Sequence, residues 1–146
     1  LFEDVVKTLF TTNCSWAFTE KMVERFIGKY GRYGAFPAVE NLRDVGAQEL
    51  RRLGLGYRGK FLAGIIRMFR QQDHDYDAAR KYPGLGPYAA AHMGILNRDY
   101  SQLPIDSSVE SYCERAYGRR DEKFIRDKFA SWHPYEFLGY KLDRSS

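Results

Sequence analysis

Apolar residues recur at three- and four-residue spacing along most of the chain, which is the period of an α-helix with one buried face. In the first predicted helix they are Phe2, Val5, Val6, Leu9 and Phe10. Comparable patterns follow in residues 16–27, 37–45, 47–53, 58–70, 77–81, 107–116, 122–132 and 135–140. No segment alternates apolar and polar residues as a strand would. The pattern predicts an all-α fold of many short helices around one core.

Two glycine turns interrupt the helical pattern, one at Gly54-Leu55-Gly56 and one at Pro83-Gly84-Leu85-Gly86. Gly84 and Gly86 can adopt positive φ, which lets the backbone approach a partner closely. A helix that starts at Pro87 exposes N–H groups, and these form a site for an anion such as a phosphate. Taken alone, the turn favours a plain corner between two core helices.

Asp106 follows Leu103-Pro104-Ile105 and comes just before a predicted helix. An aspartate is a favoured N-cap, and capping alone accounts for its presence there. A fixed carboxylate can also stabilise positive charge on a sugar, or orient and deprotonate a water molecule. Ser107 and Ser108, at the start of the same helix, are candidates for phosphate contact.

Composition limits the class of protein. At 146 residues we expect one domain, and because Leu1 and Phe2 already belong to a helical pattern we expect upstream residues to be missing. The net charge of +4 suits a nucleic-acid partner without requiring one. No apolar run is long enough to cross a membrane, and we expect no signal peptide. Cys14 and Cys113 are too few for a disulfide scaffold or a four-cysteine cluster, and the histidines lack zinc-site spacing. We expect an intracellular protein, in the cytoplasm or nucleus, that is monomeric and needs no cofactor.

The hairpin and the aspartate together resemble the helix–hairpin–helix (HhH-GPD) DNA glycosylase superfamily. Residues 82–90 are similar to its hairpin signature, and Leu103-Pro104-Ile105-Asp106 is similar to its proline-x-aspartate, at matching spacing. The resemblance covers nearly all of residues 1–146 and implies an all-α HhH-GPD glycosylase domain. It implies that Asp106 is catalytic and that the partner is double-stranded DNA with a damaged base. The base would be flipped out, and its N-glycosidic bond hydrolysed.

The position of Tyr88 bears on the reaction. In members that also cut the DNA strand, a lysine stands there and forms a Schiff base with the sugar, so the resemblance implies a monofunctional enzyme. Gly86-Pro87-Tyr88 is also similar to the Gly-Pro-Trp of bacterial 3-methyladenine glycosylases, and His92 matches another pocket position of that group. Aromatic faces attract electron-poor alkylated purines. These residues favour an alkylated purine as substrate, with Tyr88 and His92 in the base pocket.

A second group of residues resembles a different branch, the 8-oxoguanine glycosylases. Asn13, Tyr57 and Arg58 match positions that contact the unpaired opposite base or wedge the duplex. Phe18 departs from that pattern, because the family has an arginine there, and this puts cytosine specificity in doubt. An 8-oxoguanine-type glycosylase is therefore the alternative enzyme. A helix–hairpin–helix module that binds DNA without catalysis is the alternative from another class.

The resemblance also bears on bound ions. In the family, hairpin carbonyls hold a monovalent cation that bridges to a phosphate, and the matching carbonyls belong to Arg80, Tyr82 and Leu85. Some members carry an iron–sulfur cluster on four closely spaced cysteines after the last helices. This chain has no cysteines there, so we expect no cluster.

Overall fold

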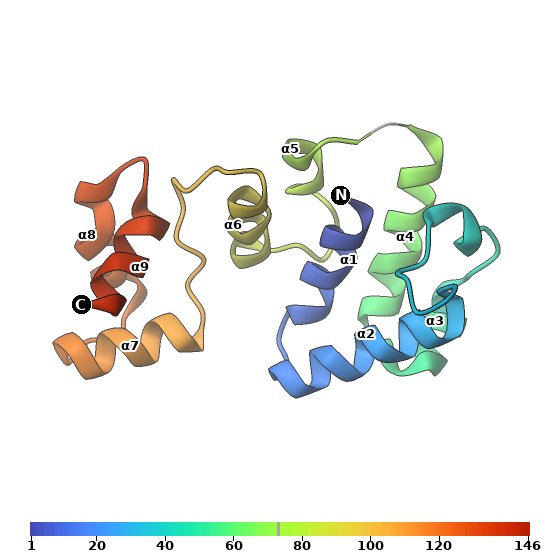
Figure 1. Ribbon diagram of the computed structural model, residues 1–146, viewed down its shortest axis with the longest axis horizontal. Coiled ribbons are helices and arrows are strands. Elements are labelled where there is room, and N and C mark those ends of the chain that lie inside the picture. Colours follow the sequence, from blue (N-terminus) through green and yellow to red (C-terminus); the bar gives the residue numbers. More distant parts are fainter. Residues whose placement is uncertain (73) are drawn as a thin grey trace. The chain divides into compact units, whose positions relative to one another are not determined.

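The structure, a computed structural model, describes residues 1–72 and 74–146 (Figure 1). Its α-helices are α1 (Phe2–Thr11), α2 (Trp16–Tyr30), α3 (Ala47–Leu50), α4 (Arg58–Gln71), α5 (Tyr76–Ala79), α6 (Pro87–Leu96), α7 (Ser107–Tyr117), α8 (Glu122–Phe129) and α9 (Glu136–Ser145). Short 3₁₀ turns lie at Val39–Leu42 and Ala130–Trp132, and a π-type turn at Arg51–Leu55. These described residues include no strand, so the all-α prediction is confirmed. None of these helices is long and apolar enough to cross a bilayer.

The chain divides into two compact units, residues 1–86 and 87–146. The sequence pattern predicts a single core, whereas each unit has its own group of buried side chains. In the first unit α1 packs on α2 and on α4. Phe10 and Phe26 meet edge to face with ring centroids 5.7 Å apart, and both are fully buried. The pattern of large apolar residues at helical spacing thus places α1, α2 and α4 around one core.

The second unit has a smaller core shared by α7, α8, α9 and the loop before α7. Its buried members are Leu103, Val109, Cys113, Ile125, Phe129 and Tyr140. The loop residue Leu103 is only 5% exposed, so the segment that leads to Asp106 is anchored in this core. Burial also raises the pKa of the Cys113 thiol, which keeps this cysteine in its unreactive protonated form.

The boundaries of several elements differ from the sequence prediction. The helix expected over residues 37–45 is a 3₁₀ turn at Val39–Leu42, and the one expected over 47–53 changes into a π-type turn after Leu50. The helix expected to run to Trp132 ends at Phe129. The sequence also predicts a polar linker over residues 71–76, and this segment includes Asp73, which lies outside the described residues.

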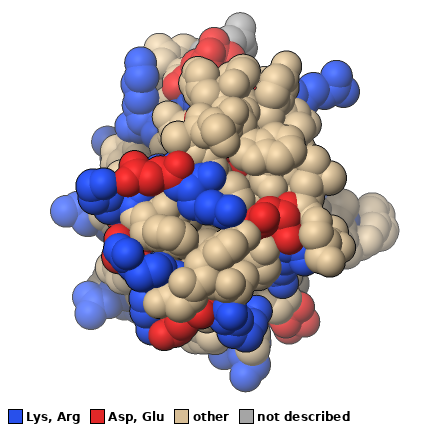
Figure 2. Space-filling model, turned by 90° about the vertical axis from the view of Figure 1, so that its left-hand side faces the viewer, with Lys and Arg blue, Asp and Glu red and all other residues tan. Residues whose placement is uncertain are grey.

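The surface of the second unit carries both signs of charge. Figure 2 shows basic and acidic side chains beside one another on the face where Figure 1 places α7, α8 and α9. Many of them are paired, as in Lys123–Asp127 at 2.6 Å and Arg126–Glu122 at 2.7 Å. Charges that are already paired attract phosphates weakly, so this face is a poor candidate for contact with a DNA backbone.

Acidification is expected to destabilise the second unit through Asp143. Its carboxylate accepts hydrogen bonds from the hydroxyls of Tyr117 and Tyr112, the latter at 2.8 Å. The bond from Tyr117, followed by the bond from Tyr112 and the charge of Lys128, lowers the pKa of Asp143. Because the folded pKa lies below the unfolded value of about 3.9, this stabilisation is present above that value and disappears as pH falls through the folded pKa.

The expected result is a lower urea midpoint at pH 3 than at pH 7, and a smaller pH dependence in Asp143→Asn. The measurement is urea unfolding followed by circular dichroism at both pH values. Asp127→Asn is the control, because it removes an exposed ion pair with Lys123 and no tyrosine contact. An unchanged pH dependence in Asp143→Asn would place the acid sensitivity at another group.

Candidate active site

Asp106 caps α7 with one of its two carboxylate oxygens. Oδ1 accepts hydrogen bonds from the backbone N–H groups of Ser108, at 2.9 Å, and Val109, at 3.0 Å. Within the described residues no group donates to Oδ2. The side chain is half-buried. One oxygen therefore fixes the carboxylate, and the other is left to act on a ligand.

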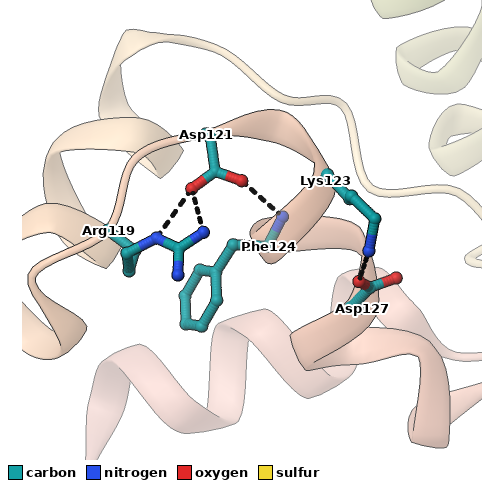
Figure 3. Close-up of polar contacts among 5 residues, drawn as sticks. All are labelled: Arg119, Asp121, Lys123, Phe124 and Asp127. Carbon is teal, nitrogen blue, oxygen red and sulfur yellow. Dashed lines mark hydrogen bonds and ion pairs between the residues drawn. The ribbon is translucent and has the colours of Figure 1, made fainter.

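Asp121, the N-cap of α8, is an example of an aspartate that only caps a helix. Asp121 caps α8 through Oδ1, which accepts from Phe124 N at 3.0 Å (Figure 3). Its Oδ2 is 2.9 Å from the Arg119 guanidinium, so both of its oxygens are used. This ion pair, followed by the backbone bond from Phe124, lowers the pKa of Asp121. Asp106 caps its helix in the same way, but no cation pairs with its second oxygen within the described residues. This oxygen is therefore available to act on a ligand.

Tyr88 and His92 lie one turn apart on α6, and their role in a base pocket stays a prediction. Their rings stack with centroids 6.2 Å apart and planes 15° apart. Burial raises the pKa of Tyr88 and lowers the pKa of His92, while the charge of Asp106 raises both. The three side chains are thus within electrostatic range of one another in the second unit. With a lowered pKa, His92 is neutral at pH 7 and presents no positive charge to a base.

The hairpin before α6 is anchored to the first unit. Tyr82 is 3% exposed, packs on Phe69 with centroids 5.7 Å apart, and hydrogen-bonds His74 through its hydroxyl. Gly84 has φ +89°, and a Cβ atom there would lie 2.7 Å from the ring of Phe61. The turn needs glycine at this position because of both backbone conformation and space.

Gly86 differs from Gly84. A Cβ atom built on it meets no heavy atom within 4 Å, and the residue is exposed. Contact with a partner was expected of both glycines; Gly86 has open space around it, whereas Phe61 and Leu9 lie against Gly84. Ser107 and Ser108 are also exposed at the start of α7, as phosphate contact would require.

The carbonyls of Arg80, Tyr82 and Leu85 stay a prediction as ligands for a monovalent cation. The Tyr82 carbonyl accepts the N–H of Leu85 at 3.1 Å, which leaves one of its two lone pairs for an ion. No cluster of three or more His, Cys, Asp or Glu side chains that could hold a metal occurs in the described ranges.

Asn13 and Tyr57 meet in the first unit although 44 positions separate them. Asn13 adopts a left-handed conformation with φ 47° just after α1, and its Nδ2 donates to the Tyr57 hydroxyl at 3.3 Å. Thr12 Oγ1 lies 3.4 Å from the same hydroxyl. The hydrogen bond with Thr12, followed by that from Asn13 and the charge of Arg58, lowers the pKa of Tyr57. The Tyr57 ring is 51% exposed; it is held at its hydroxyl, and the Arg58 guanidinium lies over one of its faces.

Arg58 is placed differently from an arginine that projects toward DNA. It is 4% exposed, and its guanidinium donates to the Thr12 carbonyl and lies 4.7 Å from the centre of the Tyr57 ring. Its Nε is buried and has no hydrogen-bond partner among residues 1–72 and 74–146. In this structure the side chain holds the corner between α1 and α4 together, and its expected contact with DNA stays a prediction.

Two contacts at this corner were not found from the sequence. Thr12 joins both Tyr57 and Arg58, and its only sequence signal was its place beside Asn13. Arg25 on α2 lies against Gly54, where a Cβ atom would be 2.4 Å from Nη1. Gly54 itself has φ +96°, so the second glycine turn also requires glycine.

The candidate residues therefore form two groups, one in each unit. Tyr88, His92 and Asp106 belong to the second unit, and Asn13 and Tyr57 to the first. A glycine hairpin precedes a helix that is capped by one oxygen of an aspartate, whose other oxygen has no donor among the described residues. This arrangement is expected of the helix–hairpin–helix glycosylases.

Comparison with known families agrees with this assignment. Residues 6–134 match the HhH-GPD superfamily of base excision DNA repair proteins. The chain belongs to this superfamily, and the resemblance inferred from the hairpin and the aspartate is confirmed.

Individual proteins similar to this chain are named as glycosylase/lyases. The N-glycosylase/DNA lyase OGG1 of Arabidopsis thaliana is 25% identical over 133 residues, which span 73% of this chain and 36% of that protein. The apo-form of the Clostridium acetobutylicum 8-oxoguanine glycosylase/lyase has a TM-score of 0.80 at 19% identity, covering 99% of this chain and 60% of that one. Its complex with double-stranded DNA containing cytosine opposite 8-oxoG has a TM-score of 0.76 at 20% identity and the same coverage. The structural likeness establishes the fold, and the chain spans between 36% and 60% of the length of these relatives.

Proposed function

We propose that this chain is the catalytic region of a base-excision DNA glycosylase that acts on oxidised guanine without cutting the strand. The observation that carries the proposal is the carboxylate of Asp106, which is fixed through Oδ1 and unpartnered at Oδ2 among the described residues. The relatives with 8-oxoguanine activity support the choice of base, and so do Asn13 and Tyr57 at the corner of the first unit. The alkylated-purine preference suggested by the sequence has weaker support.

Asp106 would act while the bond between the base and deoxyribose breaks. As the C1′–N bond lengthens, its electron pair leaves with the base and positive charge develops on the sugar. A carboxylate held near that charge stabilises it without having to reorganise. A water molecule then adds to C1′, and its proton passes to the carboxylate or to solvent. The products are the free base and an abasic site in an uncut strand.

Recognition of the lesion would require the base to leave the helix. Unstacking a base costs a few kcal/mol, and less at a damaged pair. Tyr57 would fill the gap, and its exposed ring with the hydroxyl bonded to Asn13 supports this role. The exposed Gly86 and Ser107 would contact phosphates of the bent strand. We propose that the protein acts inside the cell on double-stranded DNA, with a monovalent cation at the hairpin carbonyls.

The stacked pair of Tyr88 and His92 favours a second candidate, an alkylated purine. Two parallel rings present faces that attract an electron-poor base, and the neutral His92 would not repel a cationic one. The oxidised-guanine assignment and this one predict different substrates for the same Asp106 chemistry.

The test is base release from a panel of duplexes that contain 8-oxoguanine opposite cytosine, alkylated purines, deaminated bases or mismatches. Each reaction is analysed with and without hot alkali. Strand breaks that appear only after alkali, and only with the 8-oxoguanine duplex, are the expected result. Release of alkylated purines alone would favour the second candidate. Binding without release from any duplex would leave the non-catalytic DNA-binding module.

Tyr88→Lys is expected to introduce the strand-cutting reaction. The wild-type tyrosine cannot form a Schiff base, so borohydride should trap no covalent complex with DNA. A lysine at this position, in electrostatic range of Asp106, should give a trapped complex and breaks without alkali. Tyr88→Phe is the control and should trap nothing. A trapped complex with the wild-type protein would mean that another amine acts as nucleophile.

A further inference from the structure

His74 connects the end of α4 to the glycine hairpin. Its Nε2 lies 2.9 Å from the carbonyl oxygen of Met68, in the last turn of α4, and its Nδ1 hydrogen-bonds the hydroxyl of Tyr82. A carbonyl oxygen only accepts, so Nε2 must donate, and Nδ1 is left to accept from the tyrosine. The last four carbonyls of a helix have no partner within it, and a histidine near the helix end commonly supplies one. One imidazole therefore caps α4 and holds a side chain of the hairpin.

Aromatic packing supports the same connection. The ring centroid of Phe69 lies 4.7 Å from that of His74 and 5.7 Å from that of Tyr82. The His74 and Tyr82 rings are 5.3 Å apart, and Phe2 at the start of α1 packs on Phe69 at 5.2 Å. Tyr82 is thus held at its ring by packing and at its hydroxyl by His74.

The hydroxyl of Tyr82 keeps its proton at neutral pH. Burial, followed by the charge of Asp75, raises the pKa of Tyr82 to about 12. The hydroxyl is therefore a hydrogen-bond donor under working conditions, and a buried donor that loses its acceptor is unfavourable. Conformations in which Tyr82 leaves His74 are disfavoured for this reason.

The backbone of Tyr82 belongs to the hairpin itself. Its N–H donates to the Ala79 carbonyl and its carbonyl accepts from the N–H of Leu85, both at 3.1 Å. The same carbonyl is one of the three predicted to hold a monovalent cation, and its second lone pair is left for that ion. Ligands of a bound ion must stay within about 0.2 Å of the ideal distance. A side chain that fixes Tyr82 therefore also fixes a candidate ligand.

We propose that His74 is a positioning residue, which holds Tyr82 so that the hairpin carbonyls keep the geometry that binds a monovalent cation and, through it, a DNA phosphate. His74 would act through the side chain of Tyr82 and not by contact with the ion. This inference rests on the proposed function, because a cation that bridges to a phosphate is expected only of a hairpin that binds DNA.

The test measures how DNA binding depends on potassium. Binding to a duplex with a tetrahydrofuran abasic analogue is followed by fluorescence anisotropy while potassium chloride replaces tetramethylammonium chloride at constant ionic strength. Tyr82→Phe removes the hydroxyl and keeps the ring. It should raise the potassium concentration for half-maximal binding by about 2- to 10-fold, the range that corresponds to one hydrogen bond. His74→Phe should have a similar effect, and the double variant should add little to it, because both changes break the same connection.

Tyr76→Phe is the matched control. It makes the same chemical change at a nearby tyrosine, whose hydroxyl donates to Asp4 on α1 at 2.8 Å. Its potassium midpoint should stay within about twofold of wild type, even where its urea midpoint falls. Hydrogen exchange at the Leu85 amide should become faster in Tyr82→Phe and not in Tyr76→Phe, because this amide donates to the Tyr82 carbonyl.

The outcomes separate this inference from the proposed function. Equal potassium midpoints in Tyr82→Phe, Tyr76→Phe and wild type, or DNA binding by the wild type that does not depend on potassium, would overturn the positioning role of His74. Base release by the wild type would then still support the glycosylase. A wild-type protein that neither binds the duplex nor releases a base would overturn both.

Discussion

Asp106→Asn is expected to slow base release by at least about 100-fold, the effect usual for removing one preorganised electrostatic group. Asparagine caps a helix as well as aspartate does, so the N–H groups of Ser108 and Val109 keep an acceptor and the fold should survive. What is lost is the negative charge at Oδ2. The measurement is the single-turnover rate of base release, with the thermal midpoint as the check on folding.

Asp121→Asn is the matched control for that experiment. It makes the same chemical change at another helix cap, where Oδ1 accepts from Phe124 and Oδ2 pairs with Arg119. We expect base release within about twofold of wild type, because surface substitutions away from the site have small effects. Wild-type activity in Asp106→Asn would mean that the carboxylate only caps α7.

Gly84→Ala is expected to destabilise the first unit by about 2–5 kcal/mol. An alanine at φ +89° costs about 1–2 kcal/mol, since its Cβ clashes with its own backbone. That Cβ would also lie 2.7 Å from Phe61 and 3.0 Å from Leu9, and overpacking a core adds about 1–3 kcal/mol. Urea unfolding of the variant and the wild type measures the difference.

Gly86→Ala, two residues away, separates stability from binding. Its Cβ would meet nothing within 4 Å and its φ is not positive, so we expect a change in stability within about 0.5 kcal/mol. Binding to DNA should nevertheless weaken, because the methyl group would hold a phosphate away from the backbone. Equal destabilisation by Gly84→Ala and Gly86→Ala would show that the backbone conformation at Gly84 does not require glycine.

Local features of the sequence predicted much of the fold. The helical spacing in α1, α2 and α4 reflects one buried face, and Ser15, a residue type favoured at N-caps, caps α2 by accepting from the N–H of Phe18. Asp106 also caps α7, because capping depends only on backbone within a few residues. The stacking of Tyr88 on His92 likewise follows from their places one turn apart on a helix.

Features that depend on distant contacts were not predictable. Arg58 reads as an exposed DNA-contacting residue in its motif, yet the carbonyl of Thr12 and the ring of Tyr57 bury it. The π-type turn over Arg51–Leu55 brings Gly54 against Arg25, a contact with no local signature. The division into two units was also missed, because helical periodicity shows which face is buried and not which helices share a core.

The way Asp106 is anchored offers a way to observe the reactive group without DNA. The amides of Ser108 and Val109 donate to its Oδ1, so their nuclear magnetic resonance signals sense the charge of that oxygen. Replacing Asp106 by asparagine in the isotope-labelled protein should therefore move both signals together. Slow hydrogen exchange at the two amides would show that their hydrogen bonds to the carboxylate are formed. Substitutions elsewhere could then be classified by whether they speed this exchange.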